Sequence, residues 1–480
     1  MQNIYKKLET FFYYIALGVF IALSLLHLLT GYADNGDFSR SAGFLFEKPH
    51  DFSTMWPAAE SEEWRRRFFG EWHDKWVFLQ NWPNTEKLFS VSPYKLYLLS
   101  QAHFSTLIGV DSSYYSIISG SILSRLILFA VFLIIAHHLR HQISNIAAWI
   151  FIALFGLILI DSSWIAFLNS FYEEQIAIVF LPLLGFLLLK FCANQSTKTG
   201  FCIILCAAFI GAAKTAYFYL PALSFLFLIP FFSSKKRLIK LALIAIFLQG
   251  VSLLPVYLGK YEKINSYHAL YFGALKVLPN TEASFIQSIG GKPVFHECIG
   301  VSAFSSLGQK CMETSNASYA DVVKLIGNHP SVGFRMIVKL FEEGRATRLE
   351  HLGKGIKNAP NFSESTVFNL WPKFFAKGLN YFIFLALLSA SFLLVAKKSI
   401  LSNKEKSVLL IGVFFATFGF SQYIVSLGDG YYEITKHLAA GNYALALSLP
   451  FIFAAIISAA HRLFFRSATP NKQRLLHDDE

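Results

Sequence analysis

Apolar runs of about bilayer length recur along the whole chain, and they constrain its fold more than any other feature. A helix needs roughly 20 mostly apolar residues to cross the hydrocarbon core, and in lipid only a helix or a closed barrel satisfies the backbone. Of the 480 residues, 54% are hydrophobic and 15% are charged, whereas a soluble domain carries about 25% charged residues. The sequence therefore predicts an all-α polytopic membrane protein.

We expect about ten transmembrane helices, with both termini on the cytoplasmic side. Basic residues gather before the first run, around residues 235–240, around 397–406 and after the last run, and such clusters favour the cytoplasmic side. Around Lys214 the runs are short, so two spans or one broken element stay open there. The expected spans are 11–30, 114–136, 143–160, 173–190, 201–213, 217–232, 241–258, 379–396, 408–427 and 443–460.

Two long polar segments divide the chain. The first, 31–113, interleaves Trp with charged residues, which favours helices in the membrane interface over a small folded loop domain. The second is expected to form a helical extracytoplasmic segment, where Cys298 and Cys311 can pair if it faces an oxidising compartment. The predicted domains are an N-terminal transmembrane module with the proposed active site (1–258), the extracytoplasmic segment (259–378), and the C-terminal helices with a basic tail (379–480).

The net charge of +12 does not indicate nucleic-acid binding. Most basic residues lie in short connections and tails beside apolar runs, which is typical of topology signals and lipid headgroup contacts. The expected partner surface is therefore membrane lipid.

Acidic residues are expected together on the outer face of the membrane. A carboxylate at the membrane boundary is partly desolvated, and its basicity can be raised. A structural interpretation also stays open, because Asp is common in turns and Glu at a helix N-terminus complements the helix dipole. The residues are Asp34 and Asp37 after the first span, Glu173 and Glu174 at the start of the fourth, and Asp429 and Glu433 in the third outer loop.

Cationic residues are expected on the same face. Lys214, Lys436 and His437 lie at outer ends of spans, and Arg125 lies inside the second span, where a charge is costly and marks a site or a buried pair. Such groups bind a phosphate by charge and hydrogen bonds. A carboxylate would take the proton of an acceptor hydroxyl, and Asp37 or Asp34 is the candidate base. We assign no metal ligands.

This layout resembles the GT-C superfamily of integral-membrane glycosyltransferases. The stretch Asp34-Asn-Gly-Asp37 resembles the acidic motif after their first span, Glu173-Glu174 the motif after their third, and Lys436-His437 their basic residues for the donor phosphate. The stretch 267–276 also resembles a segment of uncharacterised bacterial members, with no assigned role. The first loop lacks an Asp-x-Asp or Asp-Glu pair, which leaves open which acid is the base and whether a divalent metal takes part.

The resemblance implies a GT-C-like fold and an inverting transfer of a hexose or pentose. The donor would be a polyprenyl-phosphate sugar, the acceptor a cell-surface glycan or a lipid-linked molecule, and the place the outer face of a bacterial inner membrane. One alternative is a lipid-linked polysaccharide polymerase or ligase that uses Arg345 and Arg348. The other is a lipid-linked glycan transporter or flippase, which the lack of a visible repeat and the position of the charges disfavour.

Overall fold

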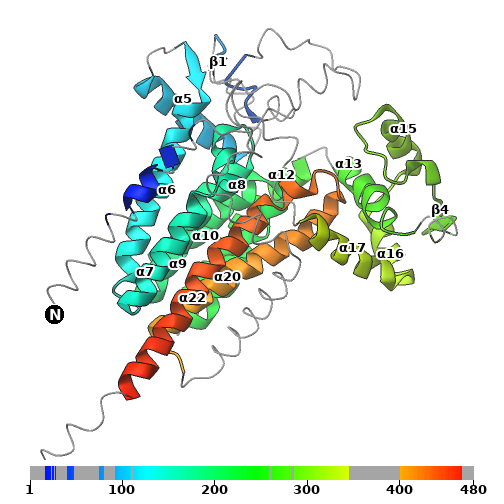
Figure 1. Ribbon diagram of the computed structural model, residues 1–480. Helices are drawn as coiled ribbons and strands as arrows, with labels where there is room; N and C mark the ends of the chain where they lie inside the picture. Colours follow the sequence, from blue (N-terminus) through cyan, green and yellow to red (C-terminus); the bar gives the residue numbers. More distant parts are fainter. Residues whose placement is uncertain are drawn as a thin grey trace, which may run out of the picture.

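The long helices of the protein run side by side as a bundle (Figure 1). The computed structural model describes parts of 14–28, then 41–47, 75–80, 92–109, 113–232, 234–258, 262–279, 282, 286–344 and 400–467. The expected span 379–396 lies outside the described residues, as does half of 11–30.

Five helices in the described part of the chain are long and apolar enough to cross a membrane. They coincide with the second, fourth, seventh, ninth and tenth expected spans, so a multi-helix membrane bundle is confirmed, while the total of ten stays a prediction. The helices are α6 (Ile117–Leu139), α9 (Glu174–Asn194), α12 (Lys235–Leu258), α20 (Asn403–Ser426) and α22 (Ala439–Ser467).

The third expected span is bent. Helix α7 is followed by α8 at an angle of 42°, and the two would count as a sixth span if taken together. The bend falls at Asp161, whose carboxylate accepts the backbone N–H of Ser163 at 2.8 Å and so caps the second helix. The elements are α7 (Asn145–Leu159), α8 (Ser162–Ile165) and the 3-10 turn η2 (Ala166–Asn169).

The chain around Lys214 forms two separate, shorter apolar helices. Helix α10 ends at Ala213, and Lys214 has an extended backbone with φ −143° and ψ 136°. This extended residue breaks the helix and turns the chain, and both two short spans and one broken element are compatible with such a break. The elements are α10 (Thr197–Ala213), η3 (Thr215–Tyr217), α11 (Leu220–Leu228) and η4 (Ile229–Phe231).

Small residues bring α20 and α22 close together. A Cβ added to Gly419 would lie 2.9 Å from the carbonyl oxygen of Gly441, which no side chain could tolerate without a shift. Close backbone approach of this kind is common between helices in lipid, where small residues replace the hydrophobic drive. Phenylalanines fill the wider gaps, and the ring of Phe451 contacts those of Phe151 and Phe415.

The described part of the first outer segment includes a short β pairing. Strand β1 (Lys75–Val77) pairs antiparallel with β2 (Tyr114–Ser116), so 114–116 do not begin the second span as expected. Ser116 instead caps α6 by accepting the N–H of Ser119 at 3.2 Å, and the helix therefore begins at Ile117. Helix α5 (Pro93–Ile108) lies between the two strands in sequence.

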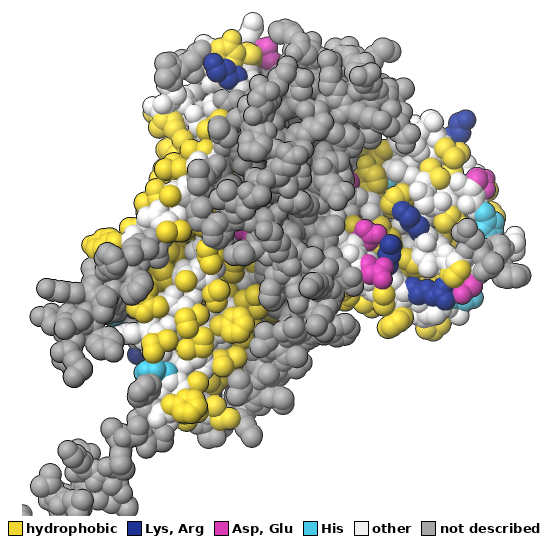
Figure 2. Space-filling model, viewed as in Figure 1, with side chains coloured by type: hydrophobic (Ala, Val, Ile, Leu, Met, Phe, Trp, Pro, Cys, Tyr) yellow, Lys and Arg dark blue, Asp and Glu magenta, His cyan; other side chains and the backbone are white. Residues whose placement is uncertain are grey.

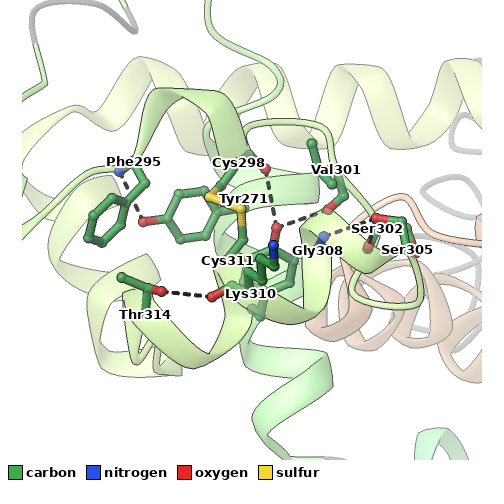
Figure 3. Close-up of a disulfide and its surroundings, with 11 residues drawn as sticks. Tyr271, Phe295, Cys298, Val301, Ser302, Ser305, Gly308, Lys310, Cys311 and Thr314 are labelled. Atoms are coloured by element: carbon green, nitrogen blue, oxygen red, sulfur yellow. Dashed lines mark hydrogen bonds between the residues drawn. A yellow bond between two sulfur atoms is a disulfide. The ribbon is translucent and has the colours of Figure 1, made fainter.

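Residues 262–344 form a small subdomain with its own apolar core, called the outer subdomain below. A disulfide joins Cys298 and Cys311 in this core, beside the ring of Tyr271 (Figure 3). Its elements are α13 (Glu262–Tyr267), the π-helix η5 (His268–Ala274), β3 (Ser288–Ile289), β4 (Lys292–Pro293), η6 (His296–Cys298), α15 (Ser306–Ser315), α16 (Tyr319–Asn328) and α17 (Pro330–Glu343).

The surface differs between the bundle and the outer subdomain. On the face shown in Figure 2, apolar side chains cover the described part of the bundle, whereas charged side chains gather over the outer subdomain. Exposed apolar residues such as Leu243, Ile246 and Phe247 on α12 are between 64% and 70% exposed. This contrast fits a bundle that contacts lipid and a subdomain that contacts water.

Candidate functional site

Two groups of charged side chains lie where the bundle helices meet the loops that connect them. The first, called the inner pair, is Glu174 with Lys214. The second, called the outer cluster, lies between the bundle and the outer subdomain. It consists of His268, Asp429, Glu433, Lys436 and His437.

The inner pair joins the ends of two neighbouring helices. Glu174 is the first residue of α9, and Lys214 directly follows the last residue of α10. The ammonium of Lys214 is hydrogen bonded to the carboxylate of Glu174, and the two side chains are only 10% and 2% exposed. Because both charges are removed from water, each needs the other, and loss of either partner would leave a buried charge.

A buried polar network connects the bundle helices beside the inner pair. The side-chain amide of Gln101 on α5 donates to Ser124 on α6 at 2.8 Å and to Gln175 on α9 at 3.2 Å. Tyr97 also bonds to Ser124, at 2.5 Å. Gln175 is the neighbour of Glu174, so this network helps to fix the start of α9.

Arg125 directly follows Ser124 in the sequence but has different hydrogen-bond partners. Its guanidinium donates to Ser121 in the preceding turn and to the side-chain oxygen of Asn169 at 3.3 Å. Asn169 in turn donates to the carbonyl of Leu28 at 2.7 Å. The arginine thus links α6 to the segment before α9 and to the first expected span.

Asp429 is the centre of the outer cluster. Its Oδ1 lies 2.8 Å from Nδ1 of His268, and its Oδ2 lies 3.2 Å from Nε2 of His437. The side chain of His268 is fully buried, whereas those of Asp429 and His437 are 19% and 18% exposed. One carboxylate therefore joins a histidine of the outer subdomain to a histidine of the bundle loops.

The hydrogen bonds of His268 define its tautomer. Its Nε2 lies 2.9 Å from the backbone nitrogen of Ala303, which can only donate. This nitrogen must therefore be the acceptor, and the proton of the neutral ring is on Nδ1. His268 consequently donates from Nδ1 to the carboxylate of Asp429.

Lys436 connects the outer cluster to the loop that precedes the inner pair. Its ammonium is hydrogen bonded to Glu433 and lies 5.5 Å from the ring centroid of Tyr172. Tyr172 is followed directly by Glu173 and Glu174, so the two charged groups are neighbours. Glu433 has a left-handed backbone with φ 45°, and such conformations in residues other than glycine often mark functional sites.

Several contacts fix the loop 427–437 against the outer subdomain. The backbone of Gly430 has φ 59°, and a Cβ there would lie 2.4 Å from the carbonyl oxygen of His268. Tyr431 donates to the carbonyl of Met336 at 2.8 Å, and Tyr319 donates to that of Gly428 at 3.1 Å. Burial, with a smaller effect from the charge of Asp429, raises the pKa of Tyr319 to about 12, so its hydroxyl remains a donor.

The predicted site residues fall into three sets. Asp34 and Asp37 lie outside the described residues, as do Arg345 and Arg348, so their roles stay predictions. The structure brings Glu174, Lys214, Lys436, His437, Asp429 and Glu433 into the two neighbouring charged groups, with Glu173 beside them, and it gives Arg125 separate partners. In the part of the chain that the structure describes, no group of three or more His, Cys, Asp or Glu side chains could hold a metal ion.

Sequence reasoning did not assign His268 to the site. It lies 161 residues before Asp429, and no spacing rule connects the two. The available signal was the stretch 267–276, which resembles a recurring segment with no assigned role. In the structure this stretch forms the end of α13 and the π-helix η5.

Comparison with known proteins places the chain in a family. Residues 2–475 match the family model described as the YfdI N-terminal transmembrane domain. A relative from Escherichia coli strain K12, described as uncharacterized protein YfdI, is 25% identical over 314 residues, which cover 61% of this chain and 66% of the relative. With the apolar helices described above, these matches indicate a multi-pass membrane protein. The chain belongs to the YfdI N-terminal transmembrane domain family.

Proposed function

We propose that the protein is a GT-C-like glycosyltransferase of the bacterial inner membrane. It moves a sugar from a polyprenyl-phosphate donor to a cell-surface glycan or lipid-linked acceptor on the outer face. The observation that carries this proposal is the juxtaposition of the inner pair and the outer cluster. Two lysines, two histidines and three carboxylates gather there at the ends of apolar helices.

The cations of the site suit the phosphate of a lipid donor. Lys436 and His437 belong to the partly exposed outer cluster, and each is paired with a carboxylate. A donor phosphate would take the place of Glu433 beside Lys436 and would accept a hydrogen bond from it. Lys214 contributes positive charge nearby while it stays bound to Glu174. Matching the charge of the phosphate makes it a better leaving group.

The proposed reaction is a displacement at the anomeric carbon. The acceptor hydroxyl oxygen bonds to this carbon, the bond from the carbon to the phosphate oxygen breaks, and its electron pair stays on the lipid phosphate. The proton of the hydroxyl passes to a carboxylate base. Asp37 or Asp34 is proposed as this base because either follows the first span directly.

The disulfide supports an extracytoplasmic position of the site. Disulfides persist in oxidising compartments and are rare in the cytosol, and the bonded Cys298 and Cys311 lie in the outer subdomain that contributes His268. The outer cluster would therefore face the same side as the acceptor glycan.

The function can be tested with purified protein in nanodiscs and a panel of radiolabelled polyprenyl-phosphate sugars. We expect release of the lipid phosphate from one donor, and loss of this release in Asp37→Asn or Asp34→Asn with donor binding retained. If no donor of the panel is bound or turned over, the transferase proposal is wrong. If both Asn variants match the wild type, neither aspartate is the base.

A further inference from the structure

The segment 267–276 takes no part in the proposed reaction, although it reaches the site. Its residues 268–274 form the π-helix η5. Helices of this kind are rare and are frequently found at functional sites. The first residue of the π-helix is His268, which is buried and bonded to Asp429.

We propose that His268 is a positioning residue, which holds Asp429 in a fixed orientation so that Asp429 in turn directs the ring of His437 toward the lipid phosphate. The orientation toward a lipid phosphate rests on the proposed function. The hydrogen-bonded chain from His268 through Asp429 to His437, called the relay below, does not depend on it. The outer subdomain then supplies His268 as part of the site.

The hydrogen bonds of the relay converge on the carboxylate of Asp429. The N–H of Ala303 donates to Nε2 of His268, and Nδ1 of His268 donates to Oδ1 of Asp429. The second oxygen, Oδ2, is left to accept from Nε2 of His437 at 3.2 Å. Because the Nε2–H of His437 donates to the carboxylate, Nδ1 is the nitrogen left for a ligand, and it donates to a phosphate when the ring is doubly protonated.

Aromatic rings prevent His268 from turning away. The ring of Tyr432 stacks on that of His268 with centroids 4.8 Å apart and an angle of 25°, and the ring of Phe304 lies 5.7 Å away. A ring packed in this way keeps the orientation of its two nitrogens. This packing distinguishes His268 from an exposed histidine that only happens to lie near a carboxylate.

The disulfide-closed loop holds Ala303, whose backbone N–H donates to His268. Ala303 lies between Cys298 and Cys311 in sequence, so the disulfide closes the loop that carries it. The hydroxyl of Tyr267 donates to the carbonyl of Val301 at 3.1 Å in the same loop. Figure 3 shows Val301 and Ser302 of this loop close to Gly308 of α15. The relay therefore begins at a rigid part of the outer subdomain.

The relay can be tested without any donor, by measuring how fast diethylpyrocarbonate modifies His437 in full-length protein in nanodiscs. Mass spectrometry gives the rate, and the exposed His329 serves as the internal reference for the reagent. His268→Leu should raise the rate at His437 by roughly tenfold, because a hydrogen bond to a charged group is lost. His268→Asn, whose amide can still donate to Asp429, should stay near the wild type.

Tyr271→Phe is the matched control. It removes a hydrogen bond, that between the Tyr271 hydroxyl and the N–H of Phe295, from the same π-helix without touching the relay. We expect no change at His437. An unchanged rate at His437 in folded His268→Leu, or an equal rise in Tyr271→Phe, would show that no relay exists.

A second measurement answers the question if His268→Leu does not fold. Histidine 15N NMR of the wild-type protein reports the tautomer of His268, with the signal assigned by its loss in His268→Asn. The relay requires the proton on Nδ1, and a proton on Nε2 overturns it. Either result is independent of sugar transfer, so an intact relay without donor turnover would count against the proposed function alone.

Discussion

The inner pair and the outer cluster are both built from opposite charges, but they differ in exposure and origin. Glu174 and Lys214 come from two ends of bundle helices and are almost fully buried. Asp429 and His437 are each about one-fifth exposed, and their partner His268 comes from the outer subdomain. A buried pair cannot separate without stranding a charge, whereas a partly exposed one can exchange a partner for a ligand. We therefore expect the inner pair to carry stability and the outer cluster to carry chemistry.

The largest effect on stability should come from breaking the inner pair. Lys214→Met leaves the carboxylate of Glu174 buried without its cation, and loss of one partner of a buried pair costs about 3–5 kcal/mol. Thermal unfolding of the purified protein in nanodiscs, together with the yield of folded protein, measures this loss.

The double variant Lys214→Met with Glu174→Gln is the control for this prediction. It removes both charges, so it should recover much of the stability lost in Lys214→Met. If Lys214→Met unfolds at the wild-type temperature, the inner pair is not a stabilising contact. The stabilising role assigned to the inner pair would then be wrong.

Asp429→Asn should give the opposite result, with a large effect on activity and a small one on folding. Asparagine has nearly the same shape but no negative charge, so it no longer orients His437 as a carboxylate does. We expect kcat for sugar transfer to fall about 100-fold, as for loss of a proton-transfer or charge-stabilising group. The melting temperature should change less than in Lys214→Met, and a larger change would reverse the roles assigned to the two groups.

Gly430→Ala should separate the outer subdomain from the bundle loop. The residue has φ 59°, and its new Cβ would meet the carbonyl oxygen of His268 at 2.4 Å, so we expect a cost of about 1–3 kcal/mol. Hydrogen exchange of η5 and of residues 427–437 would measure the loosened contact.

Gly428→Ala is the matched control two residues away. The nearest atom to a Cβ there is the Tyr319 hydroxyl at 3.9 Å, which is ordinary contact. Equal exchange rates in the two alanine variants would contradict the tight docking of this loop.

The smallest effect on stability should come from a change at Asp321. This carboxylate of the outer subdomain belongs to neither the inner pair nor the outer cluster. Burial alone would raise its pKa, but hydrogen bonds from Lys292 and Ser318 outweigh it and hold the pKa below its usual range. The carboxylate therefore stabilises the capping box of α16 above its ordinary pKa of about 4, and this stabilisation is lost as the pH falls through the lowered value.

Asp321→Asn should accordingly weaken α16 by about 1 kcal/mol at neutral pH, the usual size of a helix-cap contact. Hydrogen exchange of α16 in both proteins measures the difference, which should shrink in acid. A difference that stays constant or grows as the pH falls would show that the charge of Asp321 is not its source.

The sequence was enough to predict features that depend on neighbouring residues. The apolar runs predicted the bundle helices, and Glu173-Glu174 was correctly expected at the start of the fourth span, where α9 begins at Glu174. The long polar stretch 259–378 between apolar runs was predicted to be a separate extracytoplasmic segment, and its position outside the membrane stays a prediction. The short pairing of β1 with β2 was missed because Tyr114–Ser116 continue directly into an apolar run and carry no strand signal of their own.

Contacts between distant residues could not be predicted in this way. Glu174 and Lys214 are 40 residues apart, and His268 and Asp429 are 161 apart. Each residue was visible as a charge near a span end or as part of a segment without a role, but the pairing depends on how helices and the outer subdomain pack. The sequence therefore suggested most members of the site and few of their partners.

The central claim is that the outer cluster, which lies beside the inner pair, binds a lipid phosphate, and donor binding tests it most directly. Native mass spectrometry of the protein in nanodiscs can measure the affinity for a polyprenyl-phosphate sugar in the wild type, Lys436→Gln and Lys292→Gln. Lys292 is a half-exposed lysine of the outer subdomain, bonded to Asp321. We predict that Lys436→Gln weakens binding roughly tenfold or more, because a charge-assisted hydrogen bond to the phosphate is lost, and that Lys292→Gln binds as the wild type does. Equal affinity in all three proteins, or an equal loss in both variants, would contradict the account.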